Sequence, residues 1–285
     1  MDAEKLIINA ALTGCVATRA QSPRLPLIPA EIAADGQEVV RLGATMLHLH
    51  AREKDGSPSW KKEIYREIIG RVREQCGDVV IVVSTTGRHG ETPEQRGDVL
   101  RLRGDVKPDM ASLTLGSVDF KRDSSVNPPE VIRRLLDTMI QAGIKPEAEI
   151  FDAGMARFAR RLADKGLLEG PRYANLILGA SGILPSAPHP LVPLVEELPE
   201  NTLWAASGIG KFASGVHDLV LAMGGYLRIG LEDCLHLTRD GKKRPATNGE
   251  LVARAVEAAR ALGRRPASIG ETSRALGLAR GPSAG

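Results

Sequence analysis

Short apolar runs alternate with amphipathic segments along the whole chain. The first run, Leu6 to Leu12, precedes a segment from Pro29 to Gly43 in which Pro29 and Glu31 suit a helix start. The runs are aliphatic and the helical patterns end in glycine, as in parallel strands joined by crossover helices. The expected pairs of strand and helix cover residues 6–12 and 29–43, 45–52 and 65–77, 79–87 and 92–104, 110–117 and 128–143, 147–154 and 155–166, 173–182 and 189–199, 202–210 and 213–224, and 226–233 and 248–263.

Eight such pairs favour a closed α/β barrel, the (β/α)8 TIM barrel, over an open doubly wound sheet. An open sheet would often carry a G-x-G-x-x-G turn after an early strand, and the chain has none there. A length of 285 residues fits a barrel kept as one domain. We therefore expect residues 1–285 to form a single domain, with a small polar tail from about residue 279 that is frayed or forms an interface strand.

Composition narrows the class of protein only slightly. The contents of 42% hydrophobic and 26% charged residues are those of an ordinary globular protein. The 38 Lys and Arg against 35 Asp and Glu are dispersed, so nucleic-acid binding is not expected. No segment approaches the roughly 20 apolar residues of a membrane span, and the N-terminus lacks the basic region of a signal peptide. With an odd number of unclustered cysteines, Cys15, Cys76 and Cys234, the sequence predicts a cytoplasmic protein with reduced thiols.

The clearest chemical signal is the pair His48 and His50. Residues two apart in a strand point to one face, so both imidazoles project away from Leu47 and Leu49, which should meet the helices. They would then face the barrel axis near the C-terminal end of the second strand, where barrel enzymes place their chemistry. Two imidazoles that converge there are typical metal ligands, although hydrogen-bonded core histidines are the alternative.

The eighth strand offers a third ligand. In residues 226–233, Arg228 and Glu232 share the parity opposite to the apolar residues, so both should face inward. Glu232 can then meet the two histidines, since alternate barrel strands contribute to common layers. A His2Glu set with open positions is the arrangement of a catalytic zinc site. The alternative for Arg228 and Glu232 is an internal salt bridge.

Asp233 follows the third ligand directly and begins a loop. It could act over the site as a general base, while Arg228 binds a substrate carboxylate or orients Asp233.

Other strand ends carry polar residues that could contact a substrate. Ser84 to Gly87 could bind a carboxylate through hydroxyl and N–H groups. Ser112 and Thr114 share one face of their strand. Glu147 and Glu149 also share a face, and one of them could accept a hydrogen bond from a histidine, although a salt bridge toward the helices is equally open.

The remaining candidates are less specific. The segment Ser207 to Lys211 follows the seventh strand, where barrel loops often bind phosphate, so it is either a cofactor phosphate site or a tight turn. The unpaired histidines are expected in loops or on helix surfaces: His89, His189, His217 and His236.

Several stretches of the chain together resemble the β-keto acid cleavage enzymes. They are INAALTG, LPLIPAEIA, LHLHARE-DG-P, VSTTG, PDMASLTLGS, PEAEIFDAGM, WAASGIGK and GGYLRIGLED. The likeness covers nearly the whole chain in order, and its specific part is LHLH together with R-x-G-x-E-D.

The resemblance implies a TIM barrel, a zinc ion, a homotetramer and a Claisen-type exchange between a β-keto acid and acetyl-CoA that gives acetoacetate and a new acyl-CoA. By position, the implied metal ligands are His48, His50 and Glu232. Asp233 matches the residue that assists deprotonation, with Arg228 as its partner. The implied substrate contacts are Ser84, which we place among the catalytic residues, Gly87 and Ser112.

One departure from the family pattern bears on the substrate. Founding-type members carry a glutamate that binds a substrate amino group shortly after the T-G of the first strand, and Val16 stands there in this chain. A cationic amino substrate is therefore not expected. Val16 fits a neutral or apolar β-keto acid, whereas Arg19 in the same loop would favour a second carboxylate.

Two competing functions stay open at this point. A metal-dependent aldolase or decarboxylating lyase could use the same His2Glu site without CoA. A non-catalytic metal-binding or scaffold protein would show no thioester turnover even with metal present.

Overall fold

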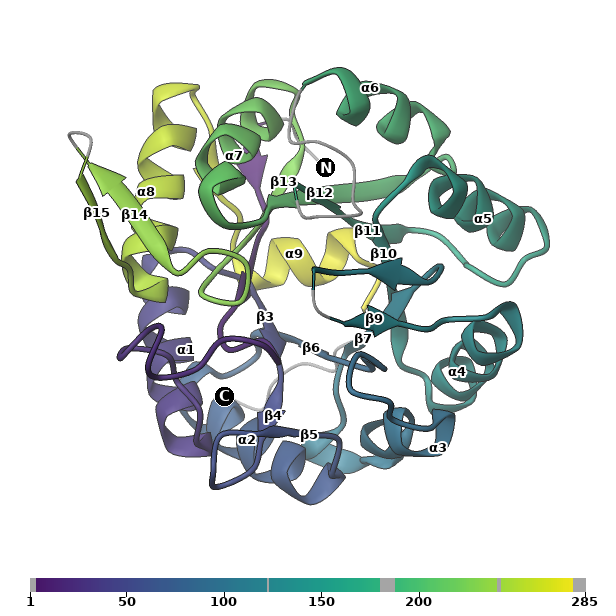
Figure 1. The fold of residues 1–285 in the computed structure, drawn as a ribbon. Helices are drawn as coiled ribbons and strands as arrows, with labels where there is room; N and C mark the ends of the chain where they lie inside the picture. Colours follow the sequence, from purple (N-terminus) through teal and green to yellow (C-terminus); the bar gives the residue numbers. More distant parts are fainter. Residues whose placement is uncertain (1–3, 122, 180–187, 240–241, 279–285) are drawn as a thin grey trace.

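Eight parallel strands close into a barrel in the computed structural model, which describes residues 4–121, 123–179, 188–239 and 242–278. The helices form an outer ring around these strands (Figure 1). The expected (β/α)8 barrel is thus confirmed. Its strands, in chain order, are β2 (Ile8–Ala11), β3 (Met46–Leu49), β6 (Val80–Val83), β7 (Met110–Thr114), β10 (Lys145–Ile150), β11 (Arg172–Leu178), β12 (Thr202–Gly208) and β13 (Tyr226–Ile229).

The barrel closes between its last and first strands. β13 pairs with β2, where Arg228 lies opposite Asn9, and β2 pairs with β3, where Ala11 lies opposite His48. This register sets the carboxyl end of β13 two strands away from β3. The two parts of the chain that carry the predicted metal ligands therefore meet at one end of the barrel.

Helices follow most of the strands as expected, and each buries one apolar stripe against the barrel. In α2, for example, Tyr65, Ile68, Ile69 and Val72 are buried while the opposite face is polar. The helices are α1 (Pro29–Leu42), α2 (Lys62–Cys76), α3 (Pro93–Arg96), α4 (Pro129–Ala142), α5 (Ala153–Asp164), α6 (Pro188–Glu197), α7 (Ala213–Ala222), α8 (Asn248–Ala261) and α9 (Ile269–Ala275).

The continuous third helix expected over 92–104 is wrong. The segment instead holds the single turn α3 and two short 3-10 helices, Asp98–Arg101 and Gly104–Val106. Gly97 ends α3, and the carboxylate of Asp98 accepts a hydrogen bond from the Lys62 N–H at the start of α2 (3.0 Å). A helix through Asp98 would remove this cap from α2.

The helix α9 was not expected from the sequence. It lies behind the barrel in Figure 1, at the end opposite the strand carboxyl ends. Thr272 of α9 donates a buried hydrogen bond to Thr45, which directly precedes β3 (2.9 Å). The short strand β16 (Arg265–Pro266) precedes α9 in the sequence and pairs in parallel with β1 (Lys5–Leu6). The tail expected from about residue 279 lies outside the described residues.

Three short antiparallel hairpins follow the carboxyl ends of barrel strands and build up the barrel mouth. They are β4 (Ala51–Arg52) with β5 (Pro58–Ser59), β8 (Val118–Asp119) with β9 (Ser124–Ser125), and β14 (His236–Arg239) with β15 (Lys242–Pro245).

Two further expectations concern thiols and membranes. Cys15, Cys76 and Cys234 are all free thiols. Within the described ranges, no helix combines the length and the apolar character that crossing a membrane would require.

Candidate active site

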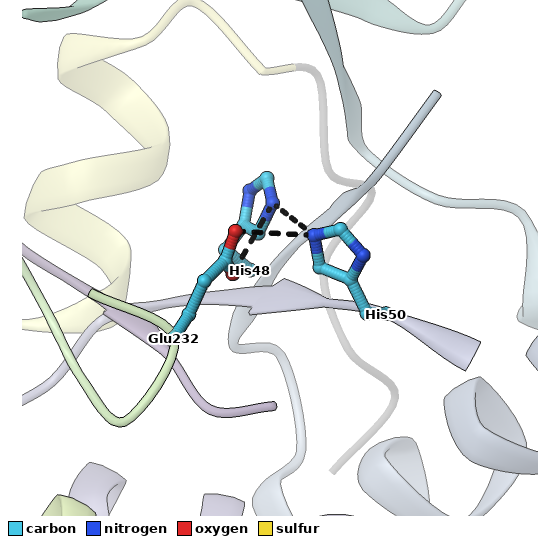
Figure 2. Close-up of side chains that lie close together, drawn as sticks. All are labelled: His48, His50 and Glu232. Atoms are coloured by element: carbon cyan, nitrogen blue, oxygen red, sulfur yellow. Dashed lines mark hydrogen bonds and ion pairs between the residues drawn. The ribbon is translucent and has the colours of Figure 1, made fainter. Parts of the chain in front are cut away.

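His48, His50 and Glu232 converge at the mouth of the barrel (Figure 2). The Nε2 atoms of the two histidines lie 3.3 Å apart. Glu232 places Oε1 3.2 Å from His50 Nε2 and Oε2 3.8 Å from His48 Nε2. His48 lies in β3 and His50 directly follows it, so strand parity brings the two rings to one side as predicted.

Glu232 reaches this cluster from a turn and not from the strand in which the sequence placed it. β13 ends at Ile229, and residues 231–233 form a turn whose Glu232 N–H donates to the Ala11 carbonyl (3.2 Å). The turn depends on Gly230, because a Cβ there would lie 2.0 Å from the Ala11 carbonyl oxygen. Gly14, with φ +63°, similarly leaves room for the Glu232 side chain, whose Cγ would lie 2.6 Å from an added Cβ.

The atoms of this cluster fit a divalent cation. A tetrahedral ion with ligands at about 2.0–2.1 Å separates them by about 3.3–3.4 Å, close to the observed spacings. His48 Nδ1 lies 3.2 Å from Glu147 Oε2, so Nδ1 carries the proton and Nε2 presents a lone pair to the cluster. Glu232 Oε2 is buried and finds no hydrogen-bond partner among the described residues. Two imidazole nitrogens and a carboxylate that face one another in this way could hold a cation between them.

A second group of potential ligands, His48, Glu147 and Glu149, is already engaged otherwise. Glu147 Oε1 accepts from the Asn9 side-chain amide (2.8 Å) while its other oxygen binds His48. Glu149 accepts from the Thr114 hydroxyl (2.8 Å) and lies 3.4 Å from Arg228 Nη1. One of the two glutamates thus accepts from a histidine, and both face inward, which excludes the salt bridge toward the helices.

Arg228 is buried at 1% exposure and contacts three carboxylates. Its nitrogens lie 2.7 Å from Glu232 Oε1, 3.1 Å from Asp233 Oδ2 and 3.4 Å from Glu149 Oε1. Burial alone would lower the pKa of the guanidinium, but the carboxylates hold it well above its ordinary value. In return, Arg228 and the histidines hold the pKa of Glu232 well below its usual range against the opposing effect of burial. The proposed metal ligand is therefore a carboxylate.

Asp233 is fixed beside this cluster by hydrogen bonds to one of its two oxygens. Asp233 Oδ2 accepts from the Ser207 hydroxyl (2.7 Å) and from Arg228 Nε (3.1 Å). The backbone carbonyl of Asp233 accepts from the Gly210 N–H (2.7 Å). No hydrogen bond within the described residues engages Oδ1, so that oxygen is available to a substrate.

A cavity of about 360 Å³ opens over the cluster. Its wall combines the charged residues of the cluster with apolar side chains from the hairpin β8–β9 and with Phe151, which directly follows β10. It is lined by Cys15, Val16, His50, Ser84, Thr86, Arg88, Thr114, Val118, Phe120, Lys121, Ser125, Glu149, Phe151, Ile177, Ile209, Arg228, Glu232 and Asp233.

Four of the predicted substrate contacts line this cavity, namely Val16, Ser84, Thr86 and Thr114. Ser112 is turned away: its Oγ accepts from the Thr85 N–H (3.2 Å). Gly87 makes room for another side chain, because a Cβ there would lie 2.7 Å from Arg96 Nη1.

Arg19 is not brought to the cavity either. It is half exposed and pairs with Glu31, the residue that caps the first helix. Arg19 therefore gives no support to the expectation that the substrate carries a second carboxylate.

Other cavity residues escaped the sequence reasoning. Arg88 and Lys121 bring cations to the cavity from loops, and the Arg88 guanidinium lies 3.7 Å from the ring centroid of Phe120, which directly precedes Lys121. Only the position of these residues just after strand ends could have indicated them.

Contrary to the prediction from the sequence, the isolated histidines do not all lie in loops or on helix surfaces. His89 is an exposed loop residue as predicted, and His236 is half-buried in β14. His217 contradicts the prediction, since it is buried in α7 and its Nε2 donates to the Arg228 carbonyl (3.0 Å). The side chain of His189 lies outside the described residues.

The segment Ser207 to Lys211 forms the tight turn that was one of its two expected roles. A Cβ at Gly208 would lie 2.8 Å from the Phe212 carbonyl oxygen, and Gly210 has φ +63°. Ser207 and Gly210 both donate hydrogen bonds to Asp233, whereas the Lys211 ammonium lies 5.0 Å from the centroid of the Phe212 ring.

A closed barrel whose mouth holds a two-histidine, one-glutamate cluster, next to an aspartate paired with a buried arginine, is the framework of a (β/α)8-barrel enzyme. The family model of the beta-keto acid cleavage enzymes matches residues 5–278, and the chain belongs to this family.

Relatives match the chain over nearly its full length. A 3-keto-5-aminohexanoate cleavage enzyme of Fusobacterium nucleatum is 36% identical, covering 96% of this chain and 98% of its own. A 3-oxoadipate:acetyl-CoA acetyltransferase of Cupriavidus necator is 31% identical over 95% of this chain and 94% of its own.

A third relative and a solved structure complete the comparison. A 3-dehydrocarnitine:acetyl-CoA trimethylamine transferase of Rhizobium meliloti is 30% identical, covering 96% of this chain and 97% of its own. The structure of ObcA in a binary complex with oxaloacetate superimposes with a TM-score of 0.81 at 21% identity, covering 90% of this chain and 68% of ObcA. At this identity the likeness concerns the fold.

Proposed function

We propose that the chain exchanges the acyl group of a β-keto acid with acetyl-CoA, giving acetoacetate and a new acyl-CoA. The carrying observation is Asp233, held by Arg228 and Ser207 with one oxygen available, beside the His48, His50 and Glu232 cluster. The names of two relatives contain both a keto acid and acetyl-CoA. In this family, that constellation supports carbon–carbon bond exchange at the barrel mouth.

The cluster suits zinc, because two imidazoles and one carboxylate are a common set for a catalytic zinc ion with open positions. His48, His50 and Glu232 would hold the ion, and Glu147 would fix the tautomer of His48. When bound, the ion supplies Lewis acidity that polarises the keto and carboxylate oxygens of the substrate and makes its C2 hydrogens more acidic.

The residues of the chain then transfer the C2 proton of the β-keto acid and position this substrate and acetyl-CoA for reaction. Asp233 takes a proton from C2, and the resulting carbanion attacks the thioester carbonyl of acetyl-CoA, so that a C–C bond forms and the C–S bond breaks. The CoA thiolate attacks the former ketone carbon, and cleavage of its bond to C2 releases the new acyl-CoA. C2 regains its proton from Asp233 as acetoacetate leaves. Arg228 keeps the Asp233 side chain oriented through the contact between its Nε and Asp233 Oδ2.

The far end of the substrate is proposed to be uncharged or anionic. Val16 lines the cavity at 50% exposure, and the cavity-lining cations beyond the Arg228 group are Arg88 and Lys121. Arg88 is also paired with Asp123 (2.7 Å). A cationic substrate end would be repelled by Arg88 and Lys121, and Val16 offers no carboxylate to pair with it. Apolar walls from Phe120, Val118 and Phe151 favour an aliphatic chain.

The test is to incubate zinc-loaded protein with acetyl-CoA and matched β-keto acids of equal length that end in a methyl, carboxylate or ammonium group. Mass spectrometry follows acetoacetate and the new acyl-CoA. We expect both products with the first two substrates and kcat/KM at least about tenfold lower with the third, equivalent to about 1.4 kcal/mol. Product formation without any acyl-CoA would instead identify an aldolase or decarboxylating lyase.

Two variants separate the roles of base and ligand. Asp233→Asn should keep the metal and lose about 10²–10⁴-fold in kcat, the usual contribution of a general base. Glu232→Gln should lose both metal retention and turnover. Full metal content and activity in the Glu232→Gln protein would show that the ligand assignment is wrong.

A further inference from the structure

A second cavity, of about 320 Å³, lies outside the catalytic pocket between α7, α8 and the hairpin β14–β15. Figure 1 shows these three elements side by side at the edge of the barrel. The loops after the seventh and eighth barrel strands contribute Gly210, Lys211 and Cys234 to its wall. In barrels, the loops after these two strands are the usual location of phosphate sites.

Cations without a salt-bridge partner among the described residues line this cavity, although the Lys211 ammonium lies 5.0 Å from the centroid of the Phe212 ring. Lys211, Lys243 and Arg254 line it, and none of the three forms a salt bridge with the described residues. They come from three separate elements: the loop after β12, the hairpin and α8. The half-buried His236 adds a potential donor, and Asp218 is the acid in the described lining. Convergent unpaired cations create a positive potential that attracts polyanions.

The floor of the cavity is apolar. Leu221, Leu235, Leu237 and Leu251 line it together with small alanines. A planar apolar ring could be buried there while charged groups remain at the rim. This combination distinguishes the cavity from a simple patch of surface lysines, which would bind inorganic anions without discrimination.

Both cavities share one wall. Ile209 and Asp233 line the catalytic pocket, and their neighbours Gly210 and Cys234 line the second cavity. The hydrogen bond from the Gly210 N–H to the Asp233 carbonyl (2.7 Å) joins the two segments of this wall. A ligand that crosses the wall could therefore place one end beside Asp233 and the other between α7 and α8.

We propose that this second cavity binds the phosphorylated adenosine end of CoA, with Lys211, Lys243 and Arg254 on the phosphates and the leucine floor under the adenine. The proposal rests on the proposed acyl exchange for the choice of polyanion. The arm of the cofactor then runs over the wall and presents the thioester to the carbanion formed at Asp233. Asp218 would accept from the adenine amino group or a ribose hydroxyl.

The experiment compares two double variants that remove the same charges. Lys211→Gln with Arg254→Gln removes two of the three cations of the cavity, whereas Arg157→Gln with Lys165→Gln removes two exposed cations on and just after α5. Calorimetry measures the Kd of each zinc-loaded protein for CoA and for adenosine 3′,5′-bisphosphate. We expect both Kd values to rise at least about tenfold in the cavity variant and to stay unchanged in the control. The cavity variant should also lose much of the salt dependence of binding.

Turnover measurements show whether a negative result concerns the CoA site or the proposed acyl exchange. In the cavity variant, KM for acetyl-CoA should rise while kcat, and KM for acetyl-pantetheine, which lacks the nucleotide, stay at the control values. Unchanged Kd values for CoA and the bisphosphate would overturn the site even if exchange occurs. Conversely, cavity-dependent binding of the bisphosphate in a protein that exchanges no β-keto acid would uphold the site and refute the proposed function.

Discussion

The orientation of His48 depends on one buried carboxylate. Glu147 is fully buried in β10, with Oε2 3.2 Å from His48 Nδ1 and Oε1 2.8 Å from the Asn9 amide nitrogen. Each oxygen therefore has a donor, and the carboxylate fixes both the ring orientation and the tautomer of the histidine. Carboxylates in this position usually raise the basicity of a metal-ligating imidazole.

Glu147→Gln should accordingly weaken zinc binding about 10–100-fold without removing a ligand. The amide can satisfy Asn9 or His48 but presents an N–H₂ group to one side, which leaves a buried donor without an acceptor. Competition with a chromophoric chelator measures the zinc affinity. Glu67→Gln, which removes a carboxylate from an exposed pair with Arg71, is the control and should keep the wild-type affinity. Equal affinities in the two variants would contradict the role of Glu147.

At the scale of elements, the turn after β13 is the part of the site most sensitive to backbone space. Gly230→Ala would force a methyl group to within 2.0 Å of the Ala11 carbonyl oxygen unless β2 and the turn separate. We expect a loss of at least about 1–3 kcal/mol in the free energy of unfolding, the usual cost of overpacking, together with weaker zinc binding through the displaced Glu232. Urea denaturation measures the first effect.

Gly215 offers a matched control within α7. A Cβ there meets no atom of the described residues within 4 Å, so Gly215→Ala adds the same methyl group without a clash against them. Since alanine is the better helix former, this variant should be neutral or more stable by up to about 1 kcal/mol. Equal stability of the two variants would show that the turn tolerates a side chain.

The direction of a site residue could be predicted from the sequence where the residue belongs to a regular strand. Two-residue parity was sufficient for His48 and His50, because β3 is regular up to Leu49. Parity also predicted that Glu232 faces inward, which it does. The reason differs, because β13 ends at Ile229 and the turn that follows, not the strand, directs the Glu232 side chain to the cluster. Arg88 and Lys121 could not be predicted, because loop backbones have no periodicity from which a direction follows.

The predicted third helix failed for a related reason. Its apolar spacing is helical, but Asp98 is engaged with the start of α2, and Val99 and Leu100 are buried from a 3-10 turn. A contact with a helix 36 residues away in sequence thus decides the local structure. Periodicity within the segment does not contain that information.

At the scale of the whole molecule, side chains of the outer helices hold the barrel mouth together. Asn248 at the start of α8 donates to the Leu12 carbonyl (2.9 Å) and accepts from the Leu231 N–H (2.7 Å). His217 of α7 donates to the Arg228 carbonyl (3.0 Å). The outer helices therefore hold the ends of β2 and β13 in place by hydrogen bonds, and these ends position Arg228 and Glu232.

The His217 clamp should make the stability of the molecule dependent on pH. Burial lowers the pKa of His217 to about 4 from an ordinary value of 6.5, although its bond to the Arg228 carbonyl opposes this shift. The unfolded chain therefore binds a proton at this residue between about pH 6.5 and pH 4 that the folded chain does not bind. The stabilising contribution of the neutral ring is complete above pH 6.5 and falls as the pH is lowered through this window.

His217→Gln should flatten this part of the pH profile, because the amide can still donate to the Arg228 carbonyl but does not titrate. Urea unfolding at several pH values between 4 and 7 measures the slope, which should decrease by the equivalent of up to one proton. His89→Gln removes an exposed loop histidine and should leave the slope as in the wild type. A wild-type slope in the His217→Gln protein would mean that acid weakens the barrel through other groups, and that the contact between α7 and β13 does not respond to pH.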